Sequence, residues 1–151
     1  MNKILTVERL KQYSENVKEL DFLIRKREFL KKRLTGPNAI NYEQTKVTSG
    51  NGQKLSNEER YAISLEAINQ KIEEKTKKLL PEHQLIKERI SSIAKWQYRK
   101  LLVYRYLEKQ KWSEIIEEFF EYEEDYEDEK DCKYKEKIMY WHRKALQELT
   151  K

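Results

Sequence analysis

Apolar residues in the first part of the chain recur at spacings of three, four and seven, which place them on one face of a helix. These residues are Val7, Leu10, Val17, Leu20, Ile24 and Leu34. We therefore predict a helix over residues 7–34. The segment Thr35–Pro37 ends it, and Gly36 suits a left-handed cap.

A second helical pattern follows residues 35–55, a segment poor in apolar residues that holds all 3 glycines and predicts a long loop. Ser56 and Glu59 have the spacing of a capping box, which marks a helix start. The apolar face then continues at Leu65, Ile68, Ile72 and Leu79. This helix, over about 57–79, either folds back on the first as an antiparallel, coiled-coil-like hairpin or pairs with a second subunit.

Pro81 marks a point where a helix ends, kinks or restarts. Beyond it the pattern predicts three short helices, at about 95–108, 112–120 and 133–149. The pause at Glu108–Lys111 contains neither Gly nor Pro, and Trp112 opens the next helix with its ring expected in the core. The last helix is expected to bury Ile138, Trp141, His142, Ala145 and Leu149.

Between the last two helices, Glu121–Asp131 carries eight acidic residues and one lysine. Such a run repels itself, so we predict an exposed loop. The whole pattern is all-α, with a hairpin region over 1–90 and a three-helix region over 91–151.

Composition agrees with long solvated helices, because 39% of the residues are charged and only 3 are Gly and 2 Pro. The net charge of +5 favours nucleic acid or an acidic surface as partner. A single cysteine excludes an internal disulfide. Without a signal peptide or a membrane span in the sequence, we expect a cytoplasmic protein.

The last three helices have the layout of a helix-turn-helix, in which the final basic helix lies in the major groove of double-stranded DNA. Any three-helix bundle with a basic surface gives the same pattern, so periodicity leaves both possibilities open. The run Arg25–Arg33 is likewise a solvated helix face, a second phosphate-contacting patch or a protein-binding surface.

The residues themselves add a resemblance. The stretch LLVYRYLEKQKWSEIIEEF, residues 101–119, resembles region 4 of bacterial RNA polymerase sigma factors, in which an apolar helix ending in Arg-Tyr is followed by a polar turn and a Trp. The ending IMYWHRKALQEL, residues 138–149, is similar to the region 4 recognition helix, with Trp141 where Leu is usual. The overall layout resembles small phage and prophage regulators of the ArpU and RinA type.

That resemblance implies a set of DNA-contacting residues. Alignment with the sigma recognition helix places Lys135, Glu136, Met139 and Tyr140 at base-reaching positions. Lysine can donate to guanine and glutamate can accept from cytosine. The expected phosphate contacts are Lys133, Lys137, Arg143 and Lys144.

The acidic insertion, at about 121–132, departs from the family, whose turn has about four residues and often a Gly. Its carboxylates would repel DNA phosphates, so trimming residues 122–130 is expected to strengthen binding. Other interpretations are a contact with RNA polymerase or a tolerated surface insertion.

Nothing in the sequence indicates an enzyme, because it has no Gly-rich phosphate loop, nucleophile elbow or paired acid and base. His83 and Cys132 lack metal-ligand spacing, and His142 is expected to pack rather than bind a metal. We expect no cofactor, no metal and no catalytic residue.

The resemblance thus implies a phage-type regulator that binds double-stranded DNA and activates late genes with host RNA polymerase, with the hairpin mediating self-association. An alternative is a module that binds RNA polymerase or a sigma factor through a degenerate helix-turn-helix and the acidic loop. A third is a DNA-packaging subunit like the small terminase, which forms rings.

Overall fold

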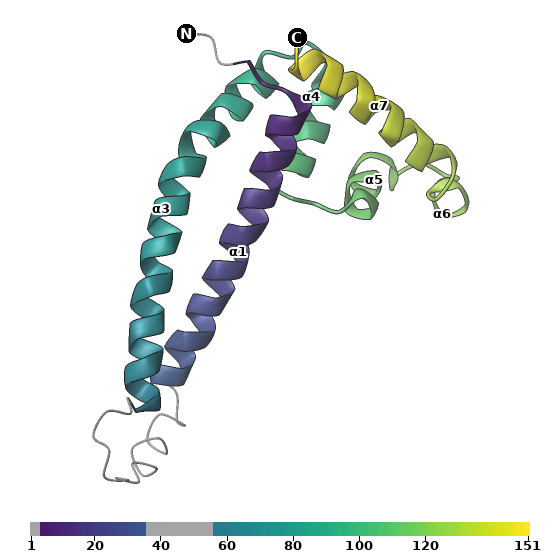
Figure 1. Ribbon diagram of the computed structural model, residues 1–151. Helices are drawn as coiled ribbons and strands as arrows, with labels where there is room; N and C mark the ends of the chain where they lie inside the picture. The colour runs from purple at the N-terminus through teal and green to yellow at the C-terminus, as the bar shows by residue number, and fades with distance from the viewer. Residues whose placement is uncertain (1–3, 36–55) are drawn as a thin grey trace. The chain divides into compact units, whose positions relative to one another are not determined.

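The computed structural model describes residues 4–35 and 56–151, and within these ranges every regular element is helical (Figure 1). The elements are α1 (Val7–Thr35), α3 (Asn57–Ser91), α4 (Trp96–Leu102), the π-helical turn η1 (Val103–Leu107), α5 (Trp112–Phe120), α6 (Tyr126–Glu129) and α7 (Lys133–Leu149). The predicted all-α fold is therefore confirmed for the described part of the chain. Thr35 is the last residue of α1, and the rest of the predicted loop, with the cap at Gly36, lies outside the described residues.

Contacts within the chain group it into two compact units. The hairpin unit comprises residues 15–79, and the C-terminal unit comprises residues 80–151 together with the segment up to residue 14. Because the boundaries fall inside α1 and α3, each long helix contributes residues to both units.

In the hairpin unit, α1 and α3 pack against each other as an antiparallel pair (Figure 1). Leu30, Ile68 and Ile72 are buried between them. Leu20, Leu23, Ile24, Tyr61 and Leu65 pack around this core. Of the two arrangements that the sequence pattern allows, the structure has the hairpin within one chain.

The start of α3 confirms the predicted capping box. The Glu59 N–H donates to Ser56 Oγ at 3.2 Å, and the Ser56 N–H donates to Glu59 Oε2 at 3.4 Å. Each side chain satisfies a backbone donor that has no partner within the helix.

Of the alternatives left open at Pro81, the helix neither ends nor restarts there, because α3 continues through Pro81 to Ser91. Proline removes one backbone donor from a helix interior and crowds the preceding turn. Leu79 before it, and Ile86 and Ile90 after it, are buried. Burial on both sides of Pro81 stabilises the continuous helix, since packing contributes more to helix stability than local propensity does.

The first turns of α1 are joined to α3 by two polar contacts inside the C-terminal unit. The Arg9 guanidinium donates to both carboxylate oxygens of Glu82, with Nε at 2.8 Å from Oε2. The Tyr13 hydroxyl lies 2.8 Å from His83 Nδ1. His83 is thus engaged in packing, and the described residues contain no cluster of His, Cys, Asp and Glu suited to a metal ion.

The predicted interruption at residues 108–111 separates η1 from α5. The helix before it is less regular than predicted, because α4 widens into η1, where the Glu108 N–H donates to the Val103 carbonyl at 2.8 Å. Lys109 then adopts a φ of 58°. One residue in the left-handed conformation therefore turns the chain without Gly or Pro.

The stability of the protein should depend on the shape of the side chain at position 109. Lys109→Val is expected to lower the free energy of unfolding by about 1–2 kcal/mol, because a β-branched side chain is strained in the left-handed region. Lys109→Gly relieves that strain and should not lower it. Chemical denaturation of the two variants provides the measurement, and equal losses would contradict the role of backbone strain.

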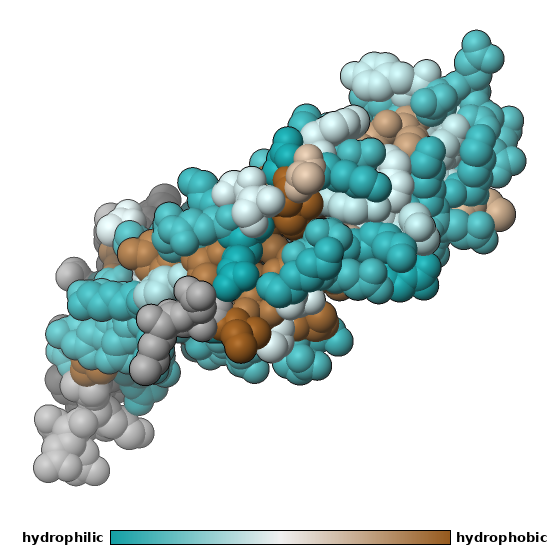
Figure 2. All heavy atoms as spheres, turned by 90° about the horizontal axis from the view of Figure 1, so that it is seen from above, coloured by the Kyte–Doolittle hydropathy of each residue, from teal (hydrophilic) through white to brown (hydrophobic). Residues whose placement is uncertain are grey.

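No helix in the described ranges is long and apolar enough to cross a membrane. The face drawn in Figure 2 is largely hydrophilic, with hydrophobic groups gathered in limited patches. In the described part of the hairpin unit, the exposed large apolar side chains are Phe22, Phe29 and Ile63, at 55%, 52% and 56% exposed.

Candidate nucleic-acid interface

Helix α7 packs against α4, α5 and α6. Its buried side chains are Tyr134, Ile138, Ala145 and Leu149, whose spacing places them on one side of the helix. Trp141 and His142, predicted to be buried, are half-buried at the edge of this stripe. The opposite side of α7 faces solvent.

The eight predicted contact residues all avoid the buried stripe. Six are exposed and two, Met139 and Lys144, are half-buried. The exposed ones are Lys133, Lys135, Glu136, Lys137, Tyr140 and Arg143. The fold therefore leaves these side chains accessible to a partner, while DNA binding itself stays a prediction.

An open hollow on α7, here called the outer hollow, has a volume of about 470 Å³. It is lined by Asp131, Cys132, Lys135, Glu136, Met139, Tyr140 and Arg143. The four residues expected to reach bases thus share one surface with Arg143. Lys133, Lys137 and Lys144 do not line it.

Aromatic rings hold several cations of α7 in place. Arg143 and Lys144 lie 5.6 and 5.7 Å from the centre of the Tyr140 ring. Lys137 lies 5.5 Å from the rings of both Phe120 and Trp141. Contact with a ring face favours a cation electrostatically and limits the side chain's freedom, which lowers the entropy lost on binding.

Lys133 differs from the other cations because its Nζ donates to Asp125 Oδ2 at 3.0 Å. The hydrogen bond from Tyr134 and then that from Lys133 lower the pKa of Asp125, and the bond to Asp125 raises the pKa of Lys133. Lys133 was expected to contact phosphate, but its charge is already paired within the chain.

The acidic segment 121–131 is not the plain exposed loop that its charge predicts. It contains α6, and the Tyr134 hydroxyl donates to Asp125 Oδ1. Tyr126 lies against Tyr134, which also stacks on Phe120 with the ring centres 4.6 Å apart. Within the segment, Tyr126 supplies packing that the carboxylates alone cannot. Most of its acidic side chains still face solvent.

Trp112 is only half-buried, which corrects the prediction that its ring fills the core. Arg105 lies 4.4 Å from the centre of the Trp112 ring, and His142 packs edge-on against the ring at 4.8 Å. The π-helical turn η1 carries Arg105 to this position. Trp112 therefore joins η1 and α7 instead of filling the core.

His142 packs as predicted and is also hydrogen-bonded. Its Nε2 lies 2.7 Å from the Tyr106 hydroxyl, and the two rings stack. Burial, with a smaller contribution from the Arg105 charge, lowers the pKa of His142 to about 4. With a pKa of about 4, the imidazole is uncharged near neutral pH while it is hydrogen-bonded to the Tyr106 hydroxyl.

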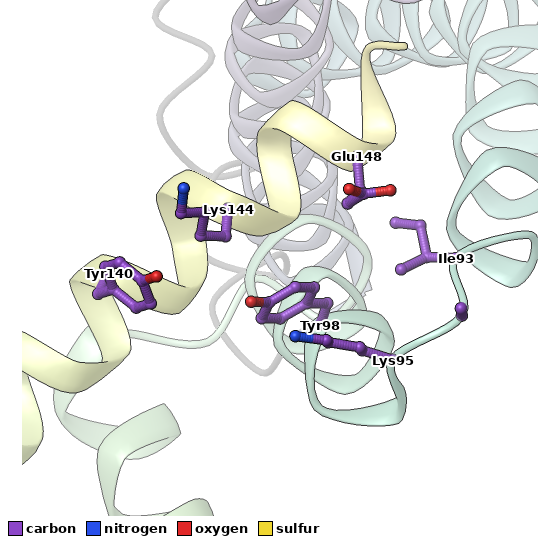
Figure 3. Close-up of a pocket in the computed structure, with 7 residues that line it drawn as sticks. Ile93, Lys95, Tyr98, Tyr140, Lys144 and Glu148 are labelled. Atoms are coloured by element: carbon purple, nitrogen blue, oxygen red, sulfur yellow. The ribbon is translucent and has the colours of Figure 1, made fainter.

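Sequence reasoning missed Lys95 and Tyr98 at the start of α4. They line a second hollow with Ile93, Tyr140, Lys144 and Glu148, here called the α4–α7 hollow (Figure 3). Lys95 and Lys144 are far apart in the sequence, and the only sequence signal was the position of Lys95 at a helix start. Packing of α4 on α7 brings them to one site.

Comparisons with protein-family models, with characterised proteins and with solved structures found no match to this chain.

Proposed function

We propose that this protein is a sequence-specific DNA-binding transcription regulator of the phage type, whose C-terminal unit works as a sigma region 4-like helix-turn-helix. In this proposal α5 positions α7, and α7 enters the major groove of double-stranded DNA. The observation that carries the proposal is the outer hollow, because Lys135, Glu136, Met139 and Tyr140 line it together.

The chemistry of the outer hollow suits base edges. Lys135 supplies a donor for guanine O6 or N7, and Glu136 supplies an acceptor for the cytosine amino group. Arg143 in the same hollow, with Lys137 and Lys144 outside it, supplies positive charge for the phosphates on either side. Binding and not chemical catalysis is the proposed mechanism.

In this proposal the regulator activates late genes with host RNA polymerase, and the hairpin unit mediates self-association. The exposed Phe22, Phe29 and Ile63 support the second point, because they offer apolar surface for another copy. Light scattering tests it: a dimer agrees with the proposal, a monomer at working concentration argues against it, and a ring of many copies favours a packaging subunit.

Selection of DNA from a random double-stranded pool tests the proposed function. The purified protein is expected to enrich one motif near physiological salt. Weak, salt-sensitive binding without any motif would overturn sequence-specific reading, because phosphate contacts alone give that behaviour.

One observation favours a second candidate, binding of RNA polymerase or a sigma factor through the acidic segment. Tyr122 is 87% exposed among exposed carboxylates, a combination suited to a basic protein surface. Co-purification with RNA polymerase that is lost in Tyr122→Ser, together with selection that yields no motif, would support this candidate over DNA reading.

Neutralising Asp125 should strengthen DNA binding. Asp125→Asn keeps an oxygen that can accept from Tyr134 but releases the charge of Lys133, whose Nζ lies 3.0 Å from the carboxylate. Affinity for all duplexes is expected to rise by roughly threefold to tenfold near 0.1 M salt. Titration by fluorescence anisotropy measures it.

Asp128→Asn is the matched control, because it removes the same charge from an exposed position in the same segment. Equal gains in both variants would mean that general repulsion, and not the pairing of Lys133, limits binding. Deleting residues 122–130 is a poorer test, since the deletion also removes Tyr126, which packs on α7.

A further inference from the structure

The α4–α7 hollow has a volume of about 300 Å³ and is formed by the turn before α4, the start of α4 and one side of α7. Figure 3 shows the Tyr98 hydroxyl directed toward Tyr140 and Lys144, and Glu148 beside Ile93, away from Tyr140. All of these residues belong to the C-terminal unit. The hollow thus has hydroxyl and ammonium donors concentrated away from its single carboxylate.

The wall of the hollow is fixed by Arg99. Its Nη1 donates to the carbonyl oxygens of Ile93 and Ala94 at 2.7 and 2.9 Å. Carbonyl oxygens at the rim of a hollow repel an anion, and here Arg99 occupies both of them. The turn is therefore held in place before any ligand binds.

The charge of the hollow favours an anion. Among the described residues, neither Lys95 nor Lys144 forms an ion pair, and their ammonium groups lie 5.2 and 5.7 Å from the ring centres of Tyr98 and Tyr140. The carboxylate of Glu148 is offset by Lys151, whose Nζ lies 2.9 Å from Oε1. The hollow therefore presents two cations whose charge no carboxylate in the described chain neutralises.

Tyr140 lines both the α4–α7 hollow and the outer hollow. The two hollows therefore adjoin at Tyr140, and a duplex with its bases at the outer hollow would bring its sugar-phosphate backbone to Lys95 and Lys144. Tyrosine rings and a pair of ammonium groups suit a deoxyribose and its phosphate, whereas about 300 Å³ is too small for a base pair with its backbone.

We infer that the α4–α7 hollow holds a backbone phosphodiester of the bound duplex, with Lys95, Tyr98 and Lys144 as its donors. The inference rests on the proposed function only in requiring that the protein binds DNA. It adds α4 to the contact surface, so that one strand is held from two helices.

The test measures binding of the selected duplex as a function of salt for Lys95→Ala and Tyr98→Phe. Lys95→Ala is expected to weaken binding by roughly threefold to tenfold near 0.1 M salt, to reduce the salt dependence by about one phosphate contact, and to leave base preference unchanged. Lys100→Ala is the matched control, because Lys100 is exposed on α4 but does not line the hollow. It should bind like the parent protein.

Replacing single phosphates by neutral methylphosphonates locates the contact. At one position, the neutral phosphate should weaken binding by the parent protein but should not weaken binding by Lys95→Ala any further. The inference is overturned if Lys95→Ala and Tyr98→Phe bind like the parent while Lys135→Ala loses base preference, and the proposed function then stands.

A different outcome would support the phosphate contact while contradicting sequence-specific reading. Binding without any preferred motif that still depends on Lys95 supports the phosphate contact and overturns sequence reading. If inorganic phosphate or a nucleoside monophosphate binds the parent protein in a Lys95-dependent way but duplex affinity does not depend on Lys95, the hollow is a small-anion site and the inference fails.

Discussion

Acidification from pH 7 to pH 4 is expected to lower the free energy of unfolding by about 1–2 kcal/mol through His142 alone, because solvent around the half-buried ring screens part of the effect. The folded-state pKa of this histidine is about 4, below its ordinary value of 6.5. Between pH 6.5 and about pH 4, the unfolded chain binds a proton at this residue that the folded chain does not. The stabilisation is therefore complete above about pH 6.5 and is lost as the pH falls toward 4.

The groups around His142 explain why its pKa is lowered. The Tyr106 hydroxyl of η1 faces Nε2, and the Trp112 ring of α5 packs against the imidazole. The Arg105 guanidinium lies over the Trp112 ring. Protonation places a cation in a half-buried site near Arg105. The described contacts include no carboxylate beside the ring that could compensate.

His142→Gln isolates this effect, because glutamine keeps a polar group near Tyr106 but does not titrate. Denaturant unfolding of both proteins at a series of pH values gives the comparison, and contributions from His83 and the carboxylates cancel in the difference. Parallel pH profiles for the two proteins would show that His142 is not held neutral by the fold.

Lys135→Ala is expected to cost about 1–3 kcal/mol of binding free energy for the preferred duplex and to relax the preference at one base position. Lys135 is exposed and lines the outer hollow beside Glu136, so its ammonium can reach a base edge once α7 is in the groove. Competition titrations with duplexes that differ at single positions measure both quantities.

Lys144→Ala provides the contrast, because Lys144 lies outside the outer hollow. It should weaken binding to all duplexes alike and reduce the salt dependence. A uniform loss in Lys135→Ala as well would place Lys135 on a phosphate and count against its role in base reading.

Local signals in the sequence predicted much of the fold. The capping box at Ser56 and Glu59 and the break after η1 are encoded by neighbouring residues, and both are in the structure. The periodicity of the last helix correctly predicted that the residues proposed to contact DNA lie off its buried face. Helix faces and caps depend on short spacings, which a single sequence displays directly.

Features that depend on distant contacts were missed. The bonds of Arg9 to Glu82 and of Tyr13 to His83 join residues that periodicity cannot relate. The charge of the acidic segment concealed the packing of Tyr126 on Tyr134. The α4–α7 hollow exists only because two helices far apart in sequence meet, so Lys95 carried no signal of its own.

The contacts of Arg9 and Tyr13 also bear on the order of events on the ribosome. The hairpin unit is one uninterrupted stretch, 15–79, and can fold as soon as it has emerged. The segment up to residue 14 belongs with residues 80–151, and Arg9 and Tyr13 bond to partners 73 and 70 residues later. That segment cannot make these bonds until the second half of α3 has been synthesised, and its unit is complete only after α7. Pausing of translation between residues 79 and 82 would therefore prolong a state in which the hairpin unit is complete but Arg9 and Tyr13 lack their partners, and such a state is a target for chaperones and proteases.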